Sequence, residues 1–197
     1  MLHIILMGLV TAQCVCGQGT LLVDQASSLG PPSESDLFSI QSASPLGQSF
    51  TPSLSAIDYI QLGMGVGNRD GLGAAVYVNL MSTSFTGPII GSTTPVVMPY
   101  GYGFQATTFY FPASVSVTPG TQYYFRIIVQ SGGTWNTGPA GPYNYAGGTG
   151  YGLGVAVPNE DLWFQEGIVV PEPSAAWFAL LGGGALVYAR HKRRVTS

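Results

Sequence analysis

The most regular feature of the sequence is an alternation of apolar and polar positions with a period of two. Between Gln122 and Gln130, the side chains of Tyr123, Phe125, Ile127 and Val129 fall on one face, and those of Tyr124, Arg126 and Ile128 on the other. This is the period of a half-buried β-strand. The segments that predict further strands are Val76 to Leu80, Phe109 to Phe111, Ile57 to Leu62 and Leu162 to Phe164.

The segments between these windows contain residues that favour turns. Residues 67–71 read Gly-Asn-Arg-Asp-Gly, and residues 118–121 read Thr-Pro-Gly-Thr. Pro119 suits the first corner of a turn, and Gly120 suits the positive-φ position that follows it. No window before the C-terminal segment sustains an apolar stripe of helical period. We therefore expect residues 18–168 to form one all-β domain, an antiparallel β-sandwich of jelly-roll type.

Residues 131–160 differ in texture, because they are rich in glycine and aromatic residues and poor in aliphatic ones. We predict a long surface loop here. Aromatic rings on such a loop can stack on sugar faces, so the segment suggests glycan binding, although packing inside the domain would explain the same residues. The candidate glycan-binding residues are Trp135, Tyr143, Tyr145 and Tyr151, with Trp163 as a further candidate.

The first seventeen residues resemble a secretory signal peptide. Leu2 to Val10 form a short apolar run, and small residues follow it up to Gly17, where we expect cleavage. The n-region contains His3 but no Lys or Arg, so a buried N-terminal strand is the alternative. A lipoprotein signal fits Cys14 and Cys16 poorly.

The C-terminal segment has three parts. Pro171, Glu172 and Pro173 come first, an apolar stretch over residues 175–189 follows, and a basic cluster completes the segment. The apolar stretch predicts a short transmembrane helix, and the basic cluster would stay on the cytoplasmic side of the membrane. The cluster consists of Arg190, Lys192, Arg193 and Arg194.

This tripartite arrangement resembles the PEP-CTERM sorting signal, and we assign it to residues 169–197. The resemblance implies recognition of Pro171, Glu172 and Pro173 by an exosortase-type enzyme, cleavage of the tail, and delivery to the outer surface or extracellular matrix of a Gram-negative-type bacterium. The three residues would then be a processing motif and not catalytic groups. An ordinary C-terminal membrane anchor is the alternative.

The body also bears a looser resemblance. The sequences at Gly47 to Pro52, Val115 to Phe125 and Asp161 to Phe164 look like those of uncharacterised extracellular sandwich domains that precede PEP-CTERM tails. This resemblance implies no activity.

Charge and composition narrow the classes of function. Charged residues make up 8% of the chain, and all nine carboxylates lie between Asp24 and Glu172, where the only basic residues are Arg69 and Arg126. An acidic body of this kind repels phosphate backbones, which argues against nucleic-acid binding. Both cysteines and both histidines lie in the terminal segments. The body therefore lacks the residues for a Ser-His-Asp triad, a Cys nucleophile or a His-based metal site.

Two weaker signals concern the carboxylates. A glycan-active enzyme needs two facing carboxyl groups, and the candidates are Glu34, Asp36, Glu160, Asp161 and Glu166. We interpret these acids as solvated surface groups. Asp58, Asn68 and Asp70 offer oxygen ligands for Ca²⁺, but the signal is weak and we favour an ordinary turn at residues 67–71. We thus expect no catalytic residue, no resident metal and no cofactor.

Taken together, these features predict a non-enzymatic, exported surface or matrix protein with a structural or adhesive role. A carbohydrate-binding module that recognises extracellular polysaccharide is the first alternative, and a glycan-active enzyme is the second. The expected partners are the exosortase-type enzyme, the membrane before processing, and extracellular polysaccharide.

Overall fold

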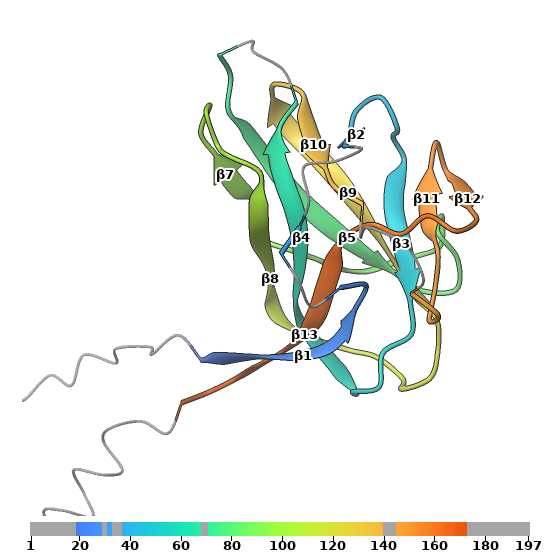
Figure 1. The fold of residues 1–197 in the computed structure, drawn as a ribbon. Coiled ribbons are helices and arrows are strands. Elements are labelled where there is room, and N and C mark those ends of the chain that lie inside the picture. Colours follow the sequence, from blue (N-terminus) through green and yellow to red (C-terminus); the bar gives the residue numbers. More distant parts are fainter. Residues whose placement is uncertain (1–18, 29–30, 33–36, 68–70, 140–144, 173–197) are drawn as a thin grey trace, which may run out of the picture. The chain divides into compact units, whose positions relative to one another are not determined.

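The computed structural model describes residues 19–28, 31–32, 37–67, 71–139 and 145–172 (Figure 1). Within this part the domain of residues 21–169 is built from antiparallel strands, and no helix is present. No helix of the described segments has the length and apolar character of a membrane span. The predicted signal peptide and the predicted helix at residues 175–189 lie outside the described residues.

The first sheet, sheet A, is ordered β1-β13-β4-β10-β2, and β8 also pairs with β4. Its strands are β1 (Thr20–Ala26), β2 (Phe38–Ser39), β4 (Ala56–Val66), β8 (Gln105–Ser116), β10 (Trp135–Thr137) and β13 (Phe164–Val170). The long strand β4 therefore carries three neighbours, with β13 and β10 each pairing with a different part of it.

The second sheet, sheet B, is ordered β12-β11-β3-β9-β5-β6, and β7 also pairs with β5. Its strands are β3 (Leu46–Phe50), β5 (Ala74–Met81), β6 (Ile89–Ser92), β7 (Val96–Met98), β9 (Tyr123–Gly132), β11 (Gly150–Gly152) and β12 (Val155–Val157). The β11–β12 hairpin lies at the end of this sheet (Figure 1).

The apolar core is formed by the alternate side chains of both sheets. Phe109, Phe125 and Phe164 are all fully buried, and Phe164 packs against both Phe125 and Phe50 at ring-centroid distances of 5.5 and 6.1 Å. The burial in β9 alternates as the sequence predicted, with Tyr123, Phe125 and Ile127 inside. The two-layer arrangement is consistent with a β-sandwich. The jelly-roll connectivity stays a prediction.

The turn expected at residues 118–121 is confirmed. Gly120 has a φ of +75°, and the amide of Thr121 donates a hydrogen bond of 3.1 Å to the carbonyl of Thr118. The strand expected at residues 162–164 is shifted, because β13 begins at Phe164 and Leu162 forms only an isolated bridge with Pro139.

The long surface loop expected at residues 131–160 is wrong in its described part. β10, β11 and β12 all fall within this segment, and Trp135 in β10 is fully buried. Each of these strands has only three residues, so a period of two cannot show in the sequence. β10 pairs with β4, β11 pairs with β3, and β12 pairs with β11, so tertiary pairing supplies the stability that local propensity does not.

Candidate functional site

The last strand of the domain changes along its length from fully buried to exposed. Phe164 and Glu166 pair with Leu62 and Ile60 of β4 and are both inaccessible to solvent. Val169 is half-buried, and its amide donates a hydrogen bond of 2.7 Å to Asp58 Oδ2. Val170, which ends the strand, is 42% exposed.

The two described residues after β13, Pro171 and Glu172, are both exposed. A proline has no amide hydrogen to donate, so the ladder of β13 cannot continue through Pro171. The first two residues of the predicted processing motif are therefore accessible where the folded strand stops. Pro173 and the basic cluster of Arg190, Lys192, Arg193 and Arg194 lie outside the described residues.

A comparison with protein families identifies the segment that follows. The family model described as the PEP-CTERM protein-sorting motif matches residues 169–194. The chain carries a PEP-CTERM sorting signal. Such a signal implies processing by an exosortase and export through the membrane to the cell surface. No curated protein and no solved structure matches the chain.

The PEP-CTERM match covers the tail alone, and the aromatic residues of the body lie outside it. The glycan-binding hypothesis requires an exposed Trp135, and this expectation is wrong. The indole is fully buried, and its ring centroid lies 5.8 Å from that of Tyr102. Trp163 is also buried, with 2% exposure. Tyr143 lies outside the described residues.

Tyr145 is half-buried, and its hydroxyl group belongs to a hydrogen-bond chain. The hydroxyl accepts a hydrogen bond of 3.2 Å from the amide of Thr51 and donates one of 3.1 Å to Gln25. Its ring meets Phe164 edge to face at 5.1 Å. Burial raises the pKa of Tyr145 to about 12. These contacts give Tyr145 a packing role.

Tyr151 on β11 is the remaining candidate. Its ring stacks on Phe85 at a centroid distance of 4.2 Å and meets Tyr124 edge to face at 5.9 Å. Phe85 lies against Gly47 of β3, on the face of the strand opposite to Leu46, which points into the core. The three rings therefore gather on the outer face of sheet B. Tyr151 is half-buried and Phe85 is 4% exposed.

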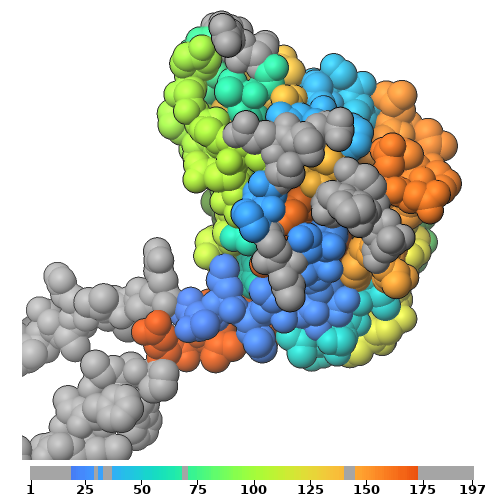
Figure 2. All heavy atoms as spheres, in the orientation of Figure 1, coloured from blue at the N-terminus to red at the C-terminus, as the bar shows by residue number. Residues whose placement is uncertain are grey.

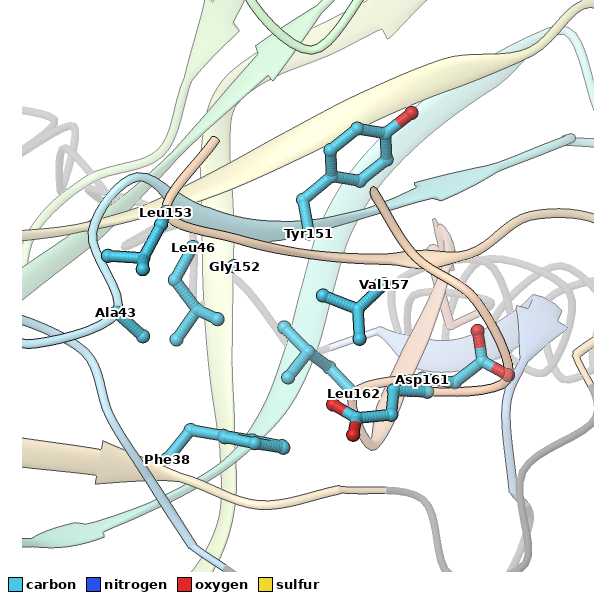
Figure 3. Close-up of a pocket in the computed structure, with 11 residues that line it drawn as sticks. Phe38, Ala43, Leu46, Tyr151, Gly152, Leu153, Val157, Asp161 and Leu162 are labelled. Carbon is cyan, nitrogen blue, oxygen red and sulfur yellow. The ribbon is translucent and has the colours of Figure 1, made fainter. Parts of the chain in front are cut away.

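Tyr151 also borders a hollow of about 250 Å³ beside the β11–β12 hairpin (Figure 3). The walls are mostly apolar, and they include Phe38, Leu46 and Leu162. Glu160 and Asp161 also contribute to its lining. The size and character of the hollow fit a small apolar group.

The interpretation of the acids as solvated surface groups is wrong for two of them. Glu166 is fully buried and Asp161 is 4% exposed, whereas Glu160 is exposed. Asp161 accepts hydrogen bonds of 2.6 Å from Gln48 and 3.0 Å from the amide of Tyr145. Sequence reasoning missed this role, because no local pattern shows that Gln48, far away in the chain, has its partner here. Glu34 and Asp36 lie outside the described residues.

The calcium hypothesis gains no support from Asp58. Its carboxylate accepts hydrogen bonds from Ser114 Oγ and from the Val169 amide, so its described partners are donors within the domain. Asn68 and Asp70 lie outside the described residues. Across the described part of the chain, no group of three or more His, Cys, Asp or Glu side chains is arranged to hold a metal ion.

Proposed function

We propose that the protein is a non-enzymatic β-sandwich, delivered to the outer surface or extracellular matrix of a Gram-negative-type bacterium, where it serves a structural or adhesive role. The observation that carries the proposal is the PEP-CTERM match at residues 169–194, which begins within the last strand of the domain. The exposure of Pro171 and Glu172 supports processing of the folded protein.

The residues of the body support a non-enzymatic role. Between residues 18 and 174 the sequence contains no histidine and no cysteine. Asp161 already accepts two hydrogen bonds from neutral donors, and the side chain of Glu166 is closed off from solvent and thus from any substrate. Neither acid is placed as one of the two facing carboxyl groups that glycoside hydrolysis needs.

The test of processing uses the full chain in a host that has an exosortase. We expect the intact mass of the surface fraction to show loss of the segment that follows the processing motif. Glu172→Ala should block this loss and keep the protein in the membrane fraction. Glu160→Ala, the same change at another exposed glutamate, should be processed normally. An intact tail in the wild-type protein would contradict the proposal.

Polysaccharide binding is a second candidate, and it is favoured by the half-buried rings of Tyr124 and Tyr151 on the outer face of sheet B, with the buried ring of Phe85 stacked on Tyr151 as support. Stacked aromatic groups offer a sugar a rigid apolar contact surface. Electrophoresis through gels that contain polysaccharide should show retarded migration of the wild type and reduced retardation of Tyr151→Ala. Tyr110→Ala on sheet A, where Tyr110 is 47% exposed, is the matched control. Equal migration of all three proteins across a panel of glycans would exclude this candidate.

A further inference from the structure

Glu166 is an acid enclosed in the body of the domain. Phe164, two residues earlier on the same strand, packs into the core, and the alternation of β13 turns Glu166 to the same face. The side chain is fully buried, and neither carboxyl oxygen has a hydrogen-bond donor among the described residues. The group within hydrogen-bonding reach is another acid, Asp24 of β1.

Strand pairing explains why these two acids meet. The amide of Phe164 donates a hydrogen bond of 2.9 Å to Ser27 Oγ, and the amide of Ser27 donates one of 3.1 Å to the Phe164 carbonyl. Further along, Leu22 and Asp24 lie against Gly167. The two strands therefore run antiparallel as neighbours in sheet A (Figures 1 and 2). This register brings Asp24 beside Glu166.

Asp24 is held in the ionised form by its other neighbours. Its carboxylate accepts hydrogen bonds from the amides of Ser53 and Leu54, at 2.7 and 3.0 Å, and from Ser53 Oγ. Gln25 Nε2 donates a further bond of 3.4 Å. Burial acts to raise the pKa of Asp24, but these hydrogen bonds outweigh it and the pKa is lowered.

Two ionised carboxylates cannot lie this close without a compensating positive charge. Arg126 of β9 is the one basic residue in the described part of the chain. It pairs with Gly47 and belongs to the outward-facing set of sheet B, away from the core side where Glu166 lies. Among the described residues, no group of three or more His, Cys, Asp or Glu side chains is arranged to hold a metal ion, which favours a proton as the group that joins the two acids.

The remaining titratable groups near Glu166 are neutral tyrosines. Tyr59 of β4 and Tyr145 both interact electrostatically with Glu166, and the pKa of each is raised to about 12, mainly by burial. The charge of Asp161 also contributes to the raised pKa of Tyr145. Burial, followed by the charge of Asp24 and the hydrogen bond to it, raises the pKa of Glu166 from 4.5 to about 9.

We propose that Glu166 and Asp24 share one proton in a hydrogen bond that links β1 to β13, so that the two strands separate more readily when the proton is lost. In the protonated state the Glu166 hydroxyl donates this hydrogen bond to the Asp24 carboxylate. Because β1 is a terminal strand of sheet A with β13 as its neighbour, loss of the proton weakens the attachment of β1 to the sheet. The proposal does not depend on the function proposed above.

Infrared spectroscopy of the full chain in detergent micelles tests the proton directly. We expect the carbonyl band of a protonated carboxylic acid at neutral pH, with loss of the band as the pH rises through about 9. Glu166→Gln should remove the band, and Glu160→Gln, at an exposed site, should retain it. Asp24→Asn removes the neighbouring charge, so the band should disappear at a lower pH. A wild-type spectrum without the band would overturn the proposal.

Hydrogen exchange tests the mechanical role of the proton. After correction for the intrinsic pH dependence of exchange, residues 20–26 and 164–170 of the wild type should exchange faster at about pH 9.5 than at about pH 6. Glu166→Gln should lose this difference, and Glu160→Gln should retain it. Equal behaviour of the two variants would overturn the proposal. A rise in the unfolding temperature of the wild type, but not of Glu166→Gln, on addition of Ca²⁺ would also overturn it, because the pair would then hold a cation.

Discussion

The amide of Val169 donates a hydrogen bond of 2.7 Å to the carboxylate of Asp58, one residue before β13 ends. The same carboxylate accepts a hydrogen bond from Ser114 of β8. Asp58 lies on β4, so this one side chain joins the strand that leads into the sorting signal to two other strands of sheet A.

Replacement of Asp58 should loosen the end of β13. Asp58→Ala removes the acceptor for both Val169 and Ser114, and we expect a loss of about 1 kcal/mol in the free energy of unfolding, as for a hydrogen-bond acceptor near the surface. Urea denaturation measures the loss, and hydrogen exchange should show faster exchange at Val169. Asp58→Asn, which retains one acceptor oxygen, should lose less. Unchanged exchange at Val169 in Asp58→Ala would show that the bond does not hold the strand.

Trp135 should be important for stability and not for binding. The indole is fully buried, so Trp135→Ala should lower the free energy of unfolding by about 3–5 kcal/mol through lost contacts and an unfilled cavity. Trp135→Phe should cost much less, because the indole nitrogen has no hydrogen-bond partner among the described residues that would be lost. Tyr110→Ala, at a half-exposed ring, is the control for urea denaturation. A near-neutral effect of Trp135→Ala would contradict the core position.

Two tyrosines should resist ionisation. The pKa values of Tyr59 and Tyr145 are raised from 10 to about 12 by burial, with a contribution from Glu166 in each case. The folded state therefore favours their neutral form, and the stability that they contribute is complete below about pH 10 and is lost as the pH rises through about 12. Ultraviolet absorbance of tyrosinate should show a late-titrating class. Tyr145→Phe and Tyr59→Phe should each reduce this class.

The glycine at position 47 should tolerate no side chain. A Cβ atom there would lie 1.8 Å from the carbonyl oxygen of Phe125 on the neighbouring strand, and 2.9 Å from the ring of Phe85. Gly47→Ala should therefore destabilise the domain by about 3 kcal/mol or more, as overpacking against a backbone does. Gly103→Ala is the matched control, because no atom lies within 4 Å of the added Cβ. Thermal unfolding compares the two, and equal midpoints would show that β3 and β9 lie further apart.

The parts of the fold that the sequence predicted are those with local signals. In β9, five or more consecutive residues alternate between core and surface, so period alone identifies the strand and its buried face. The turn at Gly120 is similarly local, because proline and glycine fix the backbone angles within the turn itself. The sorting signal can be recognised from the sequence alone, and the family comparison confirms the presence of the signal.

The parts that the sequence could not predict depend on partners distant in the chain. Trp135 lies in a stretch rich in glycine and aromatic residues, which led us to expect an exposed ring, and only the pairing of β10 with β4 takes that ring into the core. Glu166 lies in a short strand among apolar residues, and its burial is explained by a hydrogen-bonding partner distant in the sequence, Asp24 of β1. A local pattern assigns acids to the surface because most acids are there.

The position of β13 within sheet A has a mechanical consequence. β1 borders one edge of β13 and β4 borders the other, so the strand that leads to the sorting signal is not at the edge of its sheet. A load applied to the chain after Val170 must strain two ladders at once before the strand comes away. A domain tethered through this end would therefore resist a steady pull better than one tethered through an edge strand.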